Sequence, residues 1–477
     1  MKRKELFKSL ILTALVISSV VLASKIWFSK ELWSGGYNSF NFKSAFFSKI
    51  SSLFGKKTKT ASLDYDQIFF PKQYMVCKSG QTVLLRPTDD QYSLLSEDIK
   101  KTLADVLGSF SVSETNESEF RKASRTPSVF VDFYNYTSLN MLADYFGIED
   151  GGEISEINNI KHLLISAENS AVYVKNDSDG KFFKLSSGTD FSGIDKRINT
   201  LISSEGSSSK LYSYAFENSF DVAPADGNAP KRLLLDPYII INIQEESVPG
   251  IKTSEGKGID QGDYGALLAQ FGMNLNTSRR FSEKDGTVNL VENFAALKIK
   301  NGGFLEYDCI SSSKGISLNS ASSDYDIIKS AGEFLEKISA YCPLNDGSDY
   351  VFSKITRENA TYTVYFDITY NGIPVLLYDE KAGGKPAHSV SVTVRDSKII
   401  NYRHALVAFE SSGSILPVKN MITALDEFYG TYDTAASPNA VINDMYNTYY
   451  CSDKGGTSVK WVVSLSNSDS VVIEGGI

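Results

Sequence analysis

Residues 9–24, SLILTALVISSVVLAS, form an uncharged apolar stretch near the start of the 477-residue chain. Lys25 interrupts the apolar character, which resumes at residues 26–28 (IWF). At about 1.5 Å per residue, a helix over residues 6–28 is about 34 Å long, which exceeds the roughly 30 Å of a bilayer's hydrocarbon core. The stretch therefore predicts a single transmembrane helix within residues 1–30.

The residues that flank this stretch predict its orientation. Four basic residues precede it: Lys2, Arg3, Lys4 and Lys8. Because positive charge collects on the cytoplasmic side of membrane proteins, the N-terminus is expected in the cytoplasm. At the other end, Lys25 can extend its ammonium to the headgroups, and Trp27 and Phe28 fall where aromatic side chains gather at the membrane interface. The bulk of the chain is therefore expected to be extracytoplasmic.

A cleaved signal peptide is the alternative to this anchor. The chain has the basic start and the apolar stretch of such a peptide, and residues 21–23 (VLA) place small residues where a signal peptidase cuts. The length of the stretch and its continuation at residues 26–28 favour an uncleaved anchor. Both alternatives export the bulk of the chain, and whether the anchor is cleaved stays open.

One face of the expected helix is narrow and lined by smaller side chains. At about 100° per residue, five positions fall on it: Ser9, Thr13, Val16, Val20 and Ala23. Small residues let helices approach closely in lipid, and hydroxyl groups add hydrogen bonds. This face is therefore predicted to bind a partner's transmembrane helix, and the alternative is an anchor that contacts only lipid.

Residues 31–61 follow the anchor and combine apolar and basic side chains. The apolar positions recur at helical spacing: Phe42, Phe46, Phe47, Ile50, Leu53 and Phe54. Five lysines accompany them: Lys43, Lys49, Lys56, Lys57 and Lys59. This pattern predicts an amphipathic helix on an anionic membrane surface. A helix packed on the first domain, or an adhesive linker, would produce the same pattern.

The composition of the chain is that of a folded, multi-domain protein. Hydrophobic residues make up 42% and aromatic residues 12%, and the net charge is −9 with a pI near 5.2. An acidic chain without a long basic run after residue 60 does not fit nucleic-acid binding, which needs phosphate neutralisation. Four scattered cysteines (Cys77, Cys309, Cys342 and Cys451) lack paired spacing and are expected to be free thiols.

Turn and linker signals divide the exported part into three domains. A Ser/Gly-rich segment at residues 203–210 and a turn-rich segment at residues 343–350 mark the boundaries. The predicted domains are residues 62–205, 206–342 and 343–477, each of mixed α/β structure with antiparallel sheets, so the fold class is α+β. Expected elements include a helix at 97–110 capped by Ser96, a helix from Thr137 that Gly147 stops, a helix at 325–341, and a hairpin turn at Asn371-Gly372.

The search for catalytic or metal-binding residues finds none. The chain has three histidines (His162, His388 and His404), which are interpreted as ordinary strand residues. It lacks the H-E-x-x-H, G-x-S-x-G and P-loop motifs. The carboxylates Asp367, Asp379 and Glu380 flank one hairpin. They are interpreted as solvated turn residues, and a carboxylate pair of the glycosidase type is the alternative. The chain is therefore predicted to use no cofactor, to bind no metal and not to be an enzyme.

Several segments spread over the chain together resemble one family. They are the basic start that runs into residues 11–16 (ILTALV), Arg279-Arg280-Phe281, 290–293 (LVEN), 297–308 (LKIKNGGFLEYD), 371–375 (NGIPV), Tyr402-Arg403 and 460–463 (KWVV). Their order and spacing are similar to those of the YycH proteins of Gram-positive bacteria. Residues 31–61 depart from the family pattern, because family members enter the first domain sooner.

The resemblance implies a single-pass membrane protein with a three-domain extracytoplasmic part. Such proteins modulate the YycG (WalK) sensor histidine kinase, which governs cell-wall metabolism, in a role similar to that of YycI. Contact with the kinase is expected through the transmembrane helix. Two other classes stay open: an exported cell-envelope module that binds a ligand or the wall without kinase contact, and an enzyme with an unrecognised site.

Overall fold

The computed structural model of the chain describes residues 69, 71–148, 157–204, 212–222, 233–254, 258–300, 302–379, 385–433, 439–452, 456–466 and 470–476. The chain divides into two compact units, Met1–Lys57 and Thr58–Ile477, and the described residues all belong to the second. Among the helices of these described ranges, none is long and apolar enough to span a membrane.

The predicted anchor and amphipathic segment lie outside the described residues. The same holds for every residue assigned to them, namely Ser9, Thr13, Val16, Val20, Ala23, Lys25, Trp27, Phe28, Phe42, Phe46, Phe47, Ile50 and Phe54. These assignments stay predictions.

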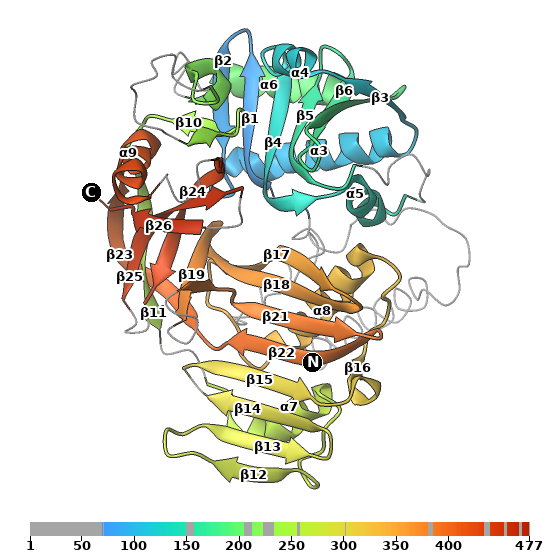
Figure 1. Cartoon of the computed structure of the whole chain (residues 1–477), viewed down its shortest axis with the longest axis vertical. Coiled ribbons are helices and arrows are strands. Elements are labelled where there is room, and N and C mark those ends of the chain that lie inside the picture. The colour runs from blue at the N-terminus through green and yellow to red at the C-terminus, as the bar shows by residue number, and fades with distance from the viewer. Residues whose placement is uncertain are drawn as a thin grey trace, which may run out of the picture. The chain divides into compact units, whose positions relative to one another are not determined.

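A seven-stranded antiparallel sheet, here called the first sheet, forms the upper part of the molecule in Figure 1. Its strands are β1 (Pro71–Lys78), β2 (Gln81–Leu85), β3 (Ser111–Thr115), β4 (Ser128–Thr137), β5 (Ile160–Ser166), β6 (Ala171–Asn176) and β7 (Lys181–Ser186), in the order β2-β1-β4-β5-β6-β7-β3. The helices between them are α3 (Asp90–Leu107), α4 (Glu117–Ala123) and α5 (Leu139–Phe146), and α6 (Ser192–Ser204) follows β7.

Both faces of the first sheet are buried. Its central strands carry apolar side chains at successive positions, so apolar groups point to both faces. On β4, Val129 and Val131 face one core, in which α3, α5 and α6 pack, while Phe130 between them faces the other. Side chains alternate between the faces of a strand, so a continuous apolar run indicates cover on both sides.

Residues 212–222 and 233–242 take part in covering the second face. They contain β8 (Tyr212–Tyr214), η3 (Ala215–Asn218) and β10 (Ile240–Asn242), while β9 (Leu234–Leu235) belongs to another sheet. Tyr214 and Tyr238 pack edge-on against Phe130 and Phe120 respectively, with ring centroids 5.1 and 4.8 Å apart. A segment assigned to the middle domain from its sequence thus completes the core of the first sheet, while the three-domain division itself stays a prediction.

A 15-stranded sheet, here called the second sheet, is formed by β9 and by most strands from β12 onward (Figure 1). The elements of this part of the chain are β11 (Glu246–Ser254), η4 (Gln261–Asp263), α7 (Tyr264–Gln270), β12 (Arg279–Ser282), β13 (Val288–Glu292), β14 (Ala295–Lys300), β15 (Phe304–Cys309), η5 (Ser312–Lys314), β16 (Ile316–Ser317), α8 (Asp324–Ser339), β17 (Ser348–Glu358), β18 (Thr361–Tyr370), β19 (Ile373–Asp379), β20 (Lys385–Ala387), β21 (Val390–Arg395), β22 (Lys398–Ala405), β23 (Ala408–Val418), α9 (Met421–Thr431), β24 (Val441–Cys451), β25 (Thr457–Leu465) and β26 (Ser470–Glu474).

The main path of the second sheet runs β12-β13-β14-β15-β22-β21-β18-β19-β24-β25-β26, with β9, β16, β17 and β20 attached at its sides. Its described pairings are antiparallel except those of β24 with β19 and with β9. β11 and β23 form a separate two-stranded ribbon. The predicted α+β fold with antiparallel sheets is therefore confirmed.

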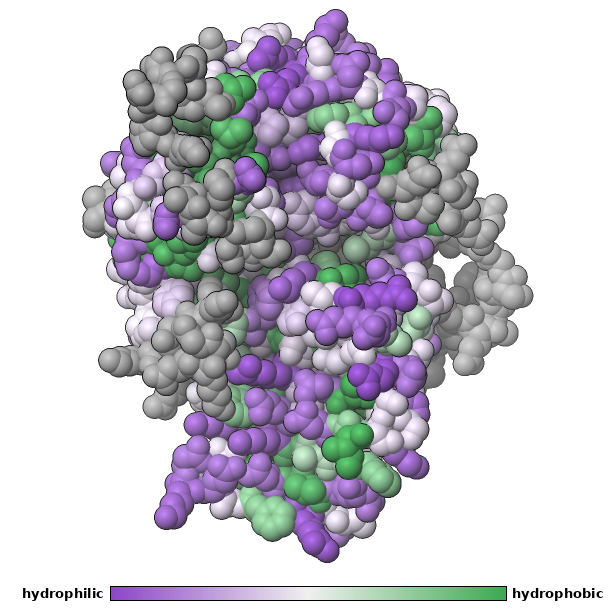
Figure 2. All heavy atoms as spheres, viewed as in Figure 1, coloured by the Kyte–Doolittle hydropathy of each residue, from purple (hydrophilic) through white to green (hydrophobic). Residues whose placement is uncertain are grey.

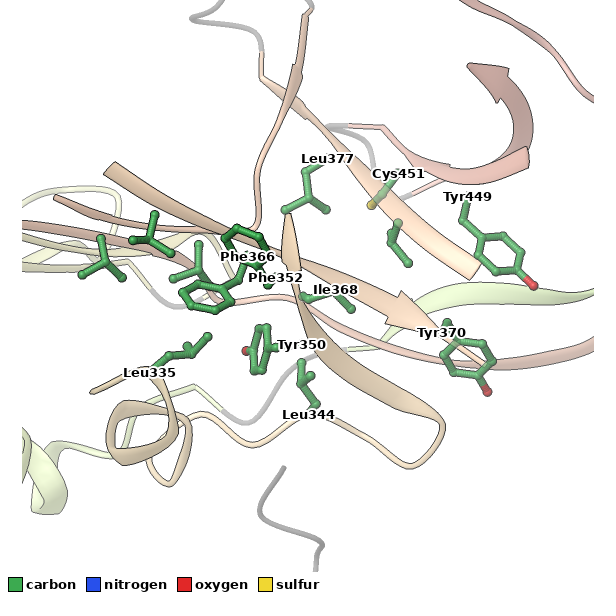
Figure 3. Close-up of a cluster of buried hydrophobic side chains, with 14 of the residues drawn as sticks. Leu335, Leu344, Tyr350, Phe352, Phe366, Ile368, Tyr370, Leu377, Tyr449 and Cys451 are labelled. Atoms are coloured by element: carbon green, nitrogen blue, oxygen red, sulfur yellow. The ribbon is translucent and has the colours of Figure 1, made fainter. Parts of the chain in front are cut away.

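Helices α7 and α8 cover one face of the second sheet and enclose its core (Figure 1). Figure 3 shows part of this core, where Leu335 of α8 lies beside Tyr350, Phe352 and Phe366 of β17 and β18. On the opposite face, Figure 2 shows that the residues seen over β21 and β22 are mainly hydrophilic. Strand register places Arg403 and Glu306 side by side on that face, with a contact of 3.6 Å.

Most local predictions are confirmed. The helix that Gly147 stops is α5, whose cap residue is Ser138, and the helix predicted at 325–341 is α8. The Asn371-Gly372 turn joins β18 to β19 with φ values of 48° and 76°, which is the left-handed conformation that a two-residue hairpin turn requires. The four cysteines are free thiols.

The predicted start of the helix at Ser96 is wrong. The helix is α3, which begins at Asp90 after the N-cap residue Asp89 and ends at Leu107. Tyr92 and Leu95 extend its buried stripe by more than a turn, so Ser96 lies inside the helix and is buried.

Candidate functional site

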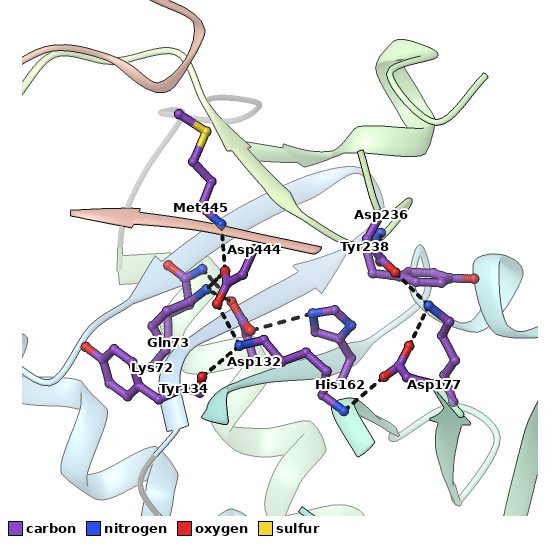
Figure 4. Close-up of polar contacts among 12 residues, drawn as sticks. Lys72, Gln73, Asp132, Tyr134, His162, Asp177, Asp236, Tyr238, Asp444 and Met445 are labelled. Carbon is purple, nitrogen blue, oxygen red and sulfur yellow. Dashed lines mark hydrogen bonds and ion pairs between the residues drawn. The ribbon is translucent and has the colours of Figure 1, made fainter. Parts of the chain in front are cut away.

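Four charged side chains meet where the two sheets touch (Figure 4). We call this contact the seam and define its ionic cluster as Lys72 of β1, Asp132 of β4, Lys161 of β5 and Asp444 of β24. The ammonium of Lys72 lies 2.8 Å from the Asp132 carboxylate and 2.6 Å from that of Asp444. The other oxygen of Asp444 lies 2.6 Å from the Lys161 ammonium. One residue of the second sheet thus bridges two lysines of the first.

The cluster is buried and its formal charges cancel. The exposed fractions of its side chains are 8% for Lys72, 4% for Asp132, 6% for Lys161 and 10% for Asp444. Burial raises the pKa of Asp444, but the nearby charges of Lys161 and Lys72 outweigh it and hold that pKa well below its usual range. Buried charges are tolerated only where they are paired. The two buried lysines therefore need Asp444 beside them, and this pairing holds β24 against the first sheet.

His162 adjoins the cluster without adding charge to it. Its Nε2 lies 3.6 Å from Asp132, and its ring stacks on Phe130 with centroids 5.1 Å apart. Burial lowers the pKa of His162 to about 3, so the ring is neutral at physiological pH.

Further contacts extend the seam on both sides of the cluster. The Tyr134 hydroxyl donates to the carbonyl of Gly372 over 2.8 Å, and Arg86 pairs with Glu246 of β11 over 2.5 Å. Lys175 of β6 lies 2.7 Å from both Asp177 and Asp236. The backbone N–H of Asp236 in turn donates to β24.

A cavity of about 650 Å³ opens at the seam beside Lys72. Its polar lining residues include Lys72, Gln73, Arg86, Asn242 and Asn447. Its apolar lining residues include Leu84, Ile240, Val248, Pro249, Ile373, Pro374, Met421, Met445 and Trp461. The cavity therefore has contributions from the first sheet, from the β18–β19 hairpin and from α9, β24 and β25.

Comparison with known proteins shows which solved structures have a similar fold. No protein-family model and no curated protein matches the chain. Among solved structures, the chain is similar to YycH from Bacillus subtilis, with a TM-score of 0.58 over 88% of this chain and 99% of that chain, at 12% sequence identity. The chain has the YycH fold. The C-terminal domain of YpeB from Bacillus megaterium aligns over 46% of this chain and 95% of that domain, with a TM-score of 0.28 and 11% identity.

In this YycH fold, two of the three histidines are buried strand residues, as predicted. His162 lies in β5, and His404 of β22 lies 2.6 and 2.9 Å from the hydroxyls of Tyr350 and Tyr402. Burial lowers the pKa of His404 to about 3. Both rings are therefore neutral members of polar networks within the cores.

His388 and Asp367 differ from their prediction. His388 lies between β20 and β21 rather than in a strand, and Asp367 lies within β18 rather than in a turn. Nδ1 of His388 is 3.0 Å from the Asp367 carboxylate and 3.4 Å from the Ser353 hydroxyl. A nucleophile triad needs the serine on one ring nitrogen and the carboxylate on the other. The shared nitrogen does not fit that arrangement.

The described part of the YycH-like fold contains no group of three or more His, Cys, Asp or Glu residues that could hold a metal ion. The Asp379 backbone ends β19, and Glu380 lies outside the described residues.

Sequence reasoning missed the ionic cluster. The available signal was a lysine within an otherwise apolar strand, as in residues 160–166 (IKHLLIS), because such a charge needs a buried partner. The partner of Lys161 is 283 residues away, so no local pattern identifies Asp444.

Proposed function

We propose that this chain is a membrane-anchored extracytoplasmic regulator of a sensor histidine kinase of the YycG/WalK type. In this proposal it acts with a YycI-like co-regulator on cell-wall metabolism and binds no nucleic acid. The observation that carries the proposal is the YycH fold, which extends over 88% of this chain and 99% of YycH. The uncharged stretch at residues 9–24 with its basic flank supports the single-pass anchor.

The mode of action that fits this fold is protein–protein interaction rather than catalysis. The histidines of the described chain are either buried and neutral or placed with serine and carboxylate on one nitrogen. A binding protein changes its partner only when it interacts differently with the partner's two states. The transmembrane helices of a sensor kinase belong to its switching element, so the anchor is the natural point of contact.

The topology makes the first testable prediction. Protease added to intact protoplasts should digest everything after about residue 30, where the spanning helix leaves the bilayer. An antibody against the C-terminal strands should then detect no protected fragment. Protection of those strands would contradict the extracytoplasmic location, and a soluble form that begins at Ser24 would show a cleaved signal peptide instead.

The second testable prediction concerns the face of the anchor with the smaller side chains. The double substitution Thr13→Leu with Ala23→Leu should reduce co-purification with the kinase by about tenfold, because it removes a close helix contact and a hydroxyl worth up to about 1–2 kcal/mol. Leu22→Ala on the opposite side of the helix is the matched control and should leave co-purification and signalling output unchanged.

Replacing the anchor by a generic poly-leucine helix distinguishes a specific helix contact with the kinase from simple attachment to the membrane. If it preserves both co-purification and kinase output, the helix is only a tether and the extracytoplasmic part carries the regulation.

A second candidate function is an exported module that binds a ligand or the wall without kinase contact. The cavity at the seam favours it. Absence of any kinase complex, with export intact, would support this function over the first.

A further inference from the structure

We propose that the cavity at the seam binds a small organic anion with a compact apolar body and one carboxylate. The cavity volume of about 650 Å³ lies within the range of about 300–1,000 Å³ that is usual for small-molecule sites. The proposal concerns the cavity alone and holds whether or not the chain contacts a kinase.

The apolar body is assigned from apolar side chains that line the cavity, among them Met421, Met445 and Trp461. Methionine side chains adapt to irregular apolar shapes, and a tryptophan ring supplies a large flat surface. The indole N–H of Trp461 donates to the carbonyl of Lys419 over 3.1 Å, so the ring is held in place and its polar atom is already used. These lining side chains therefore offer apolar contact to a ligand.

The carboxylate is assigned from the charged side chains that line the cavity. Among the described lining residues, Lys72 and Arg86 carry charge, and both are cations. The Lys72 ammonium is already paired with Asp132 and Asp444, so Arg86 is the cation assigned to the ligand. Arg86 bonds Glu246 through Nη1, which leaves its Nε and Nη2 without a hydrogen bond in the described structure. Its side chain is 37% exposed, whereas that of Glu246 is 18% exposed. An incoming ligand thus meets guanidinium donors, which suit a carboxylate.

The cavity also belongs to both sheets. Lys72 and Arg86 come from the first-sheet side, while Met445 and Trp461 come from β24 and β25 of the second sheet. A ligand in the cavity contacts both sides of the seam, and it therefore stabilises their observed arrangement by mass action.

Trp461 provides a readout at the site itself. The chain has three tryptophans, so in the full chain in nanodiscs with Trp27→Phe and Trp33→Phe the indole emission comes from Trp461 alone. The ligand used is 4-iodobenzoate, whose iodine quenches indole emission on contact. We expect saturable quenching with a Kd below about 1 mM, and at least about tenfold weaker binding of the neutral 4-iodobenzyl alcohol.

Two variants test whether the cavity is the binding site. Arg86→Gln should bring the affinities of the acid and the alcohol to within about threefold of each other, because it removes the cation. Asn447→Phe should abolish saturable quenching, because a larger side chain at this lining position occupies cavity space. Phe281→Ser, on the exposed edge strand β12, is the control and should change nothing. Circular dichroism verifies that each variant is folded.

Three results would overturn the proposal. They are quenching that rises linearly up to about 10 mM, equal affinity for the acid and the alcohol, and unchanged binding in both cavity variants.

Discussion

Replacing Asp444 by asparagine is expected to lower the free energy of unfolding by about 3–5 kcal/mol. The substitution leaves the ammonium groups of Lys72 and Lys161 buried with Asp132 as their only carboxylate in the cluster, and an uncompensated buried charge costs about this much. Urea unfolding of the full chain in detergent, followed by circular dichroism, measures the change. Glu114→Gln is the control, because it breaks an exposed pair with Lys181 and should cost less than about 1 kcal/mol.

A compensated variant tests whether charge is the cause. Asp444→Leu together with Lys161→Met removes one charge of each sign and leaves the pair of Lys72 and Asp132 at 2.8 Å. This variant should recover at least about half of the stability that Asp444→Leu alone loses, since apolar replacement of a buried pair is often neutral. If the double variant is no more stable than the single one, lost packing rather than unpaired charge is the cause.

The same cluster sets a pH dependence. The folded pKa of Asp444 lies below the value of about 3.9 for an unfolded aspartate, so its contribution is complete above that pH and is lost as the pH falls through the folded value. Burial lowers the pKa of Lys72, but Asp132 and Asp444 outweigh burial and raise it. Its contribution is therefore complete below about pH 10.4 and is lost as the pH rises through the folded value. The stability difference between wild type and Asp444→Asn should be level at neutral pH and shrink below about pH 4.

Gly372→Ala is expected to destabilise the seam by about 2–4 kcal/mol. A methyl group at this position would overlap Cβ of Pro87, whose ring cannot turn away, and the residue has φ of 76°. Gly180→Ala is the matched control, because Gly180 has φ of 71° with open space around it. Its cost should be limited to backbone strain of about 1 kcal/mol. Equal urea midpoints for the two variants would contradict a tight contact between the hairpin and Pro87.

Local patterns predicted the elements whose causes are local. The αL glycine after α5, the Asn371-Gly372 turn and the apolar stripe of α8 each depend on neighbouring residues. The start of α3 was misplaced because two sites, Asp89 and Ser96, both suit a helix cap, and only the tertiary burial of Tyr92 and Leu95 distinguishes them.

Pairings between segments far apart in the chain could not be predicted from the sequence. The parallel contact of β19 with β24 joins Val375 to Tyr449 within a mostly antiparallel sheet, and no turn signal marks it. The cavity and the ionic cluster depend on such pairings, because their walls come from segments far apart in the chain. The predicted anchor residues, by contrast, follow from hydropathy alone and await experiment.

The second face of the first sheet has a bearing on how the chain folds as it is synthesised. Phe130 and Tyr173 emerge before Tyr214 and Tyr238, which cover that face. Lys72 is made 372 residues ahead of Asp444. During elongation the aromatic face of the first sheet stays exposed until Tyr214 and Tyr238 are synthesised. Lys72, Lys161 and Asp132 likewise lack Asp444 until the end of synthesis. Exposed apolar surfaces favour aggregation. The first sheet is thus synthesised first, but its second face and its buried charges are completed only when later parts of the chain have been made.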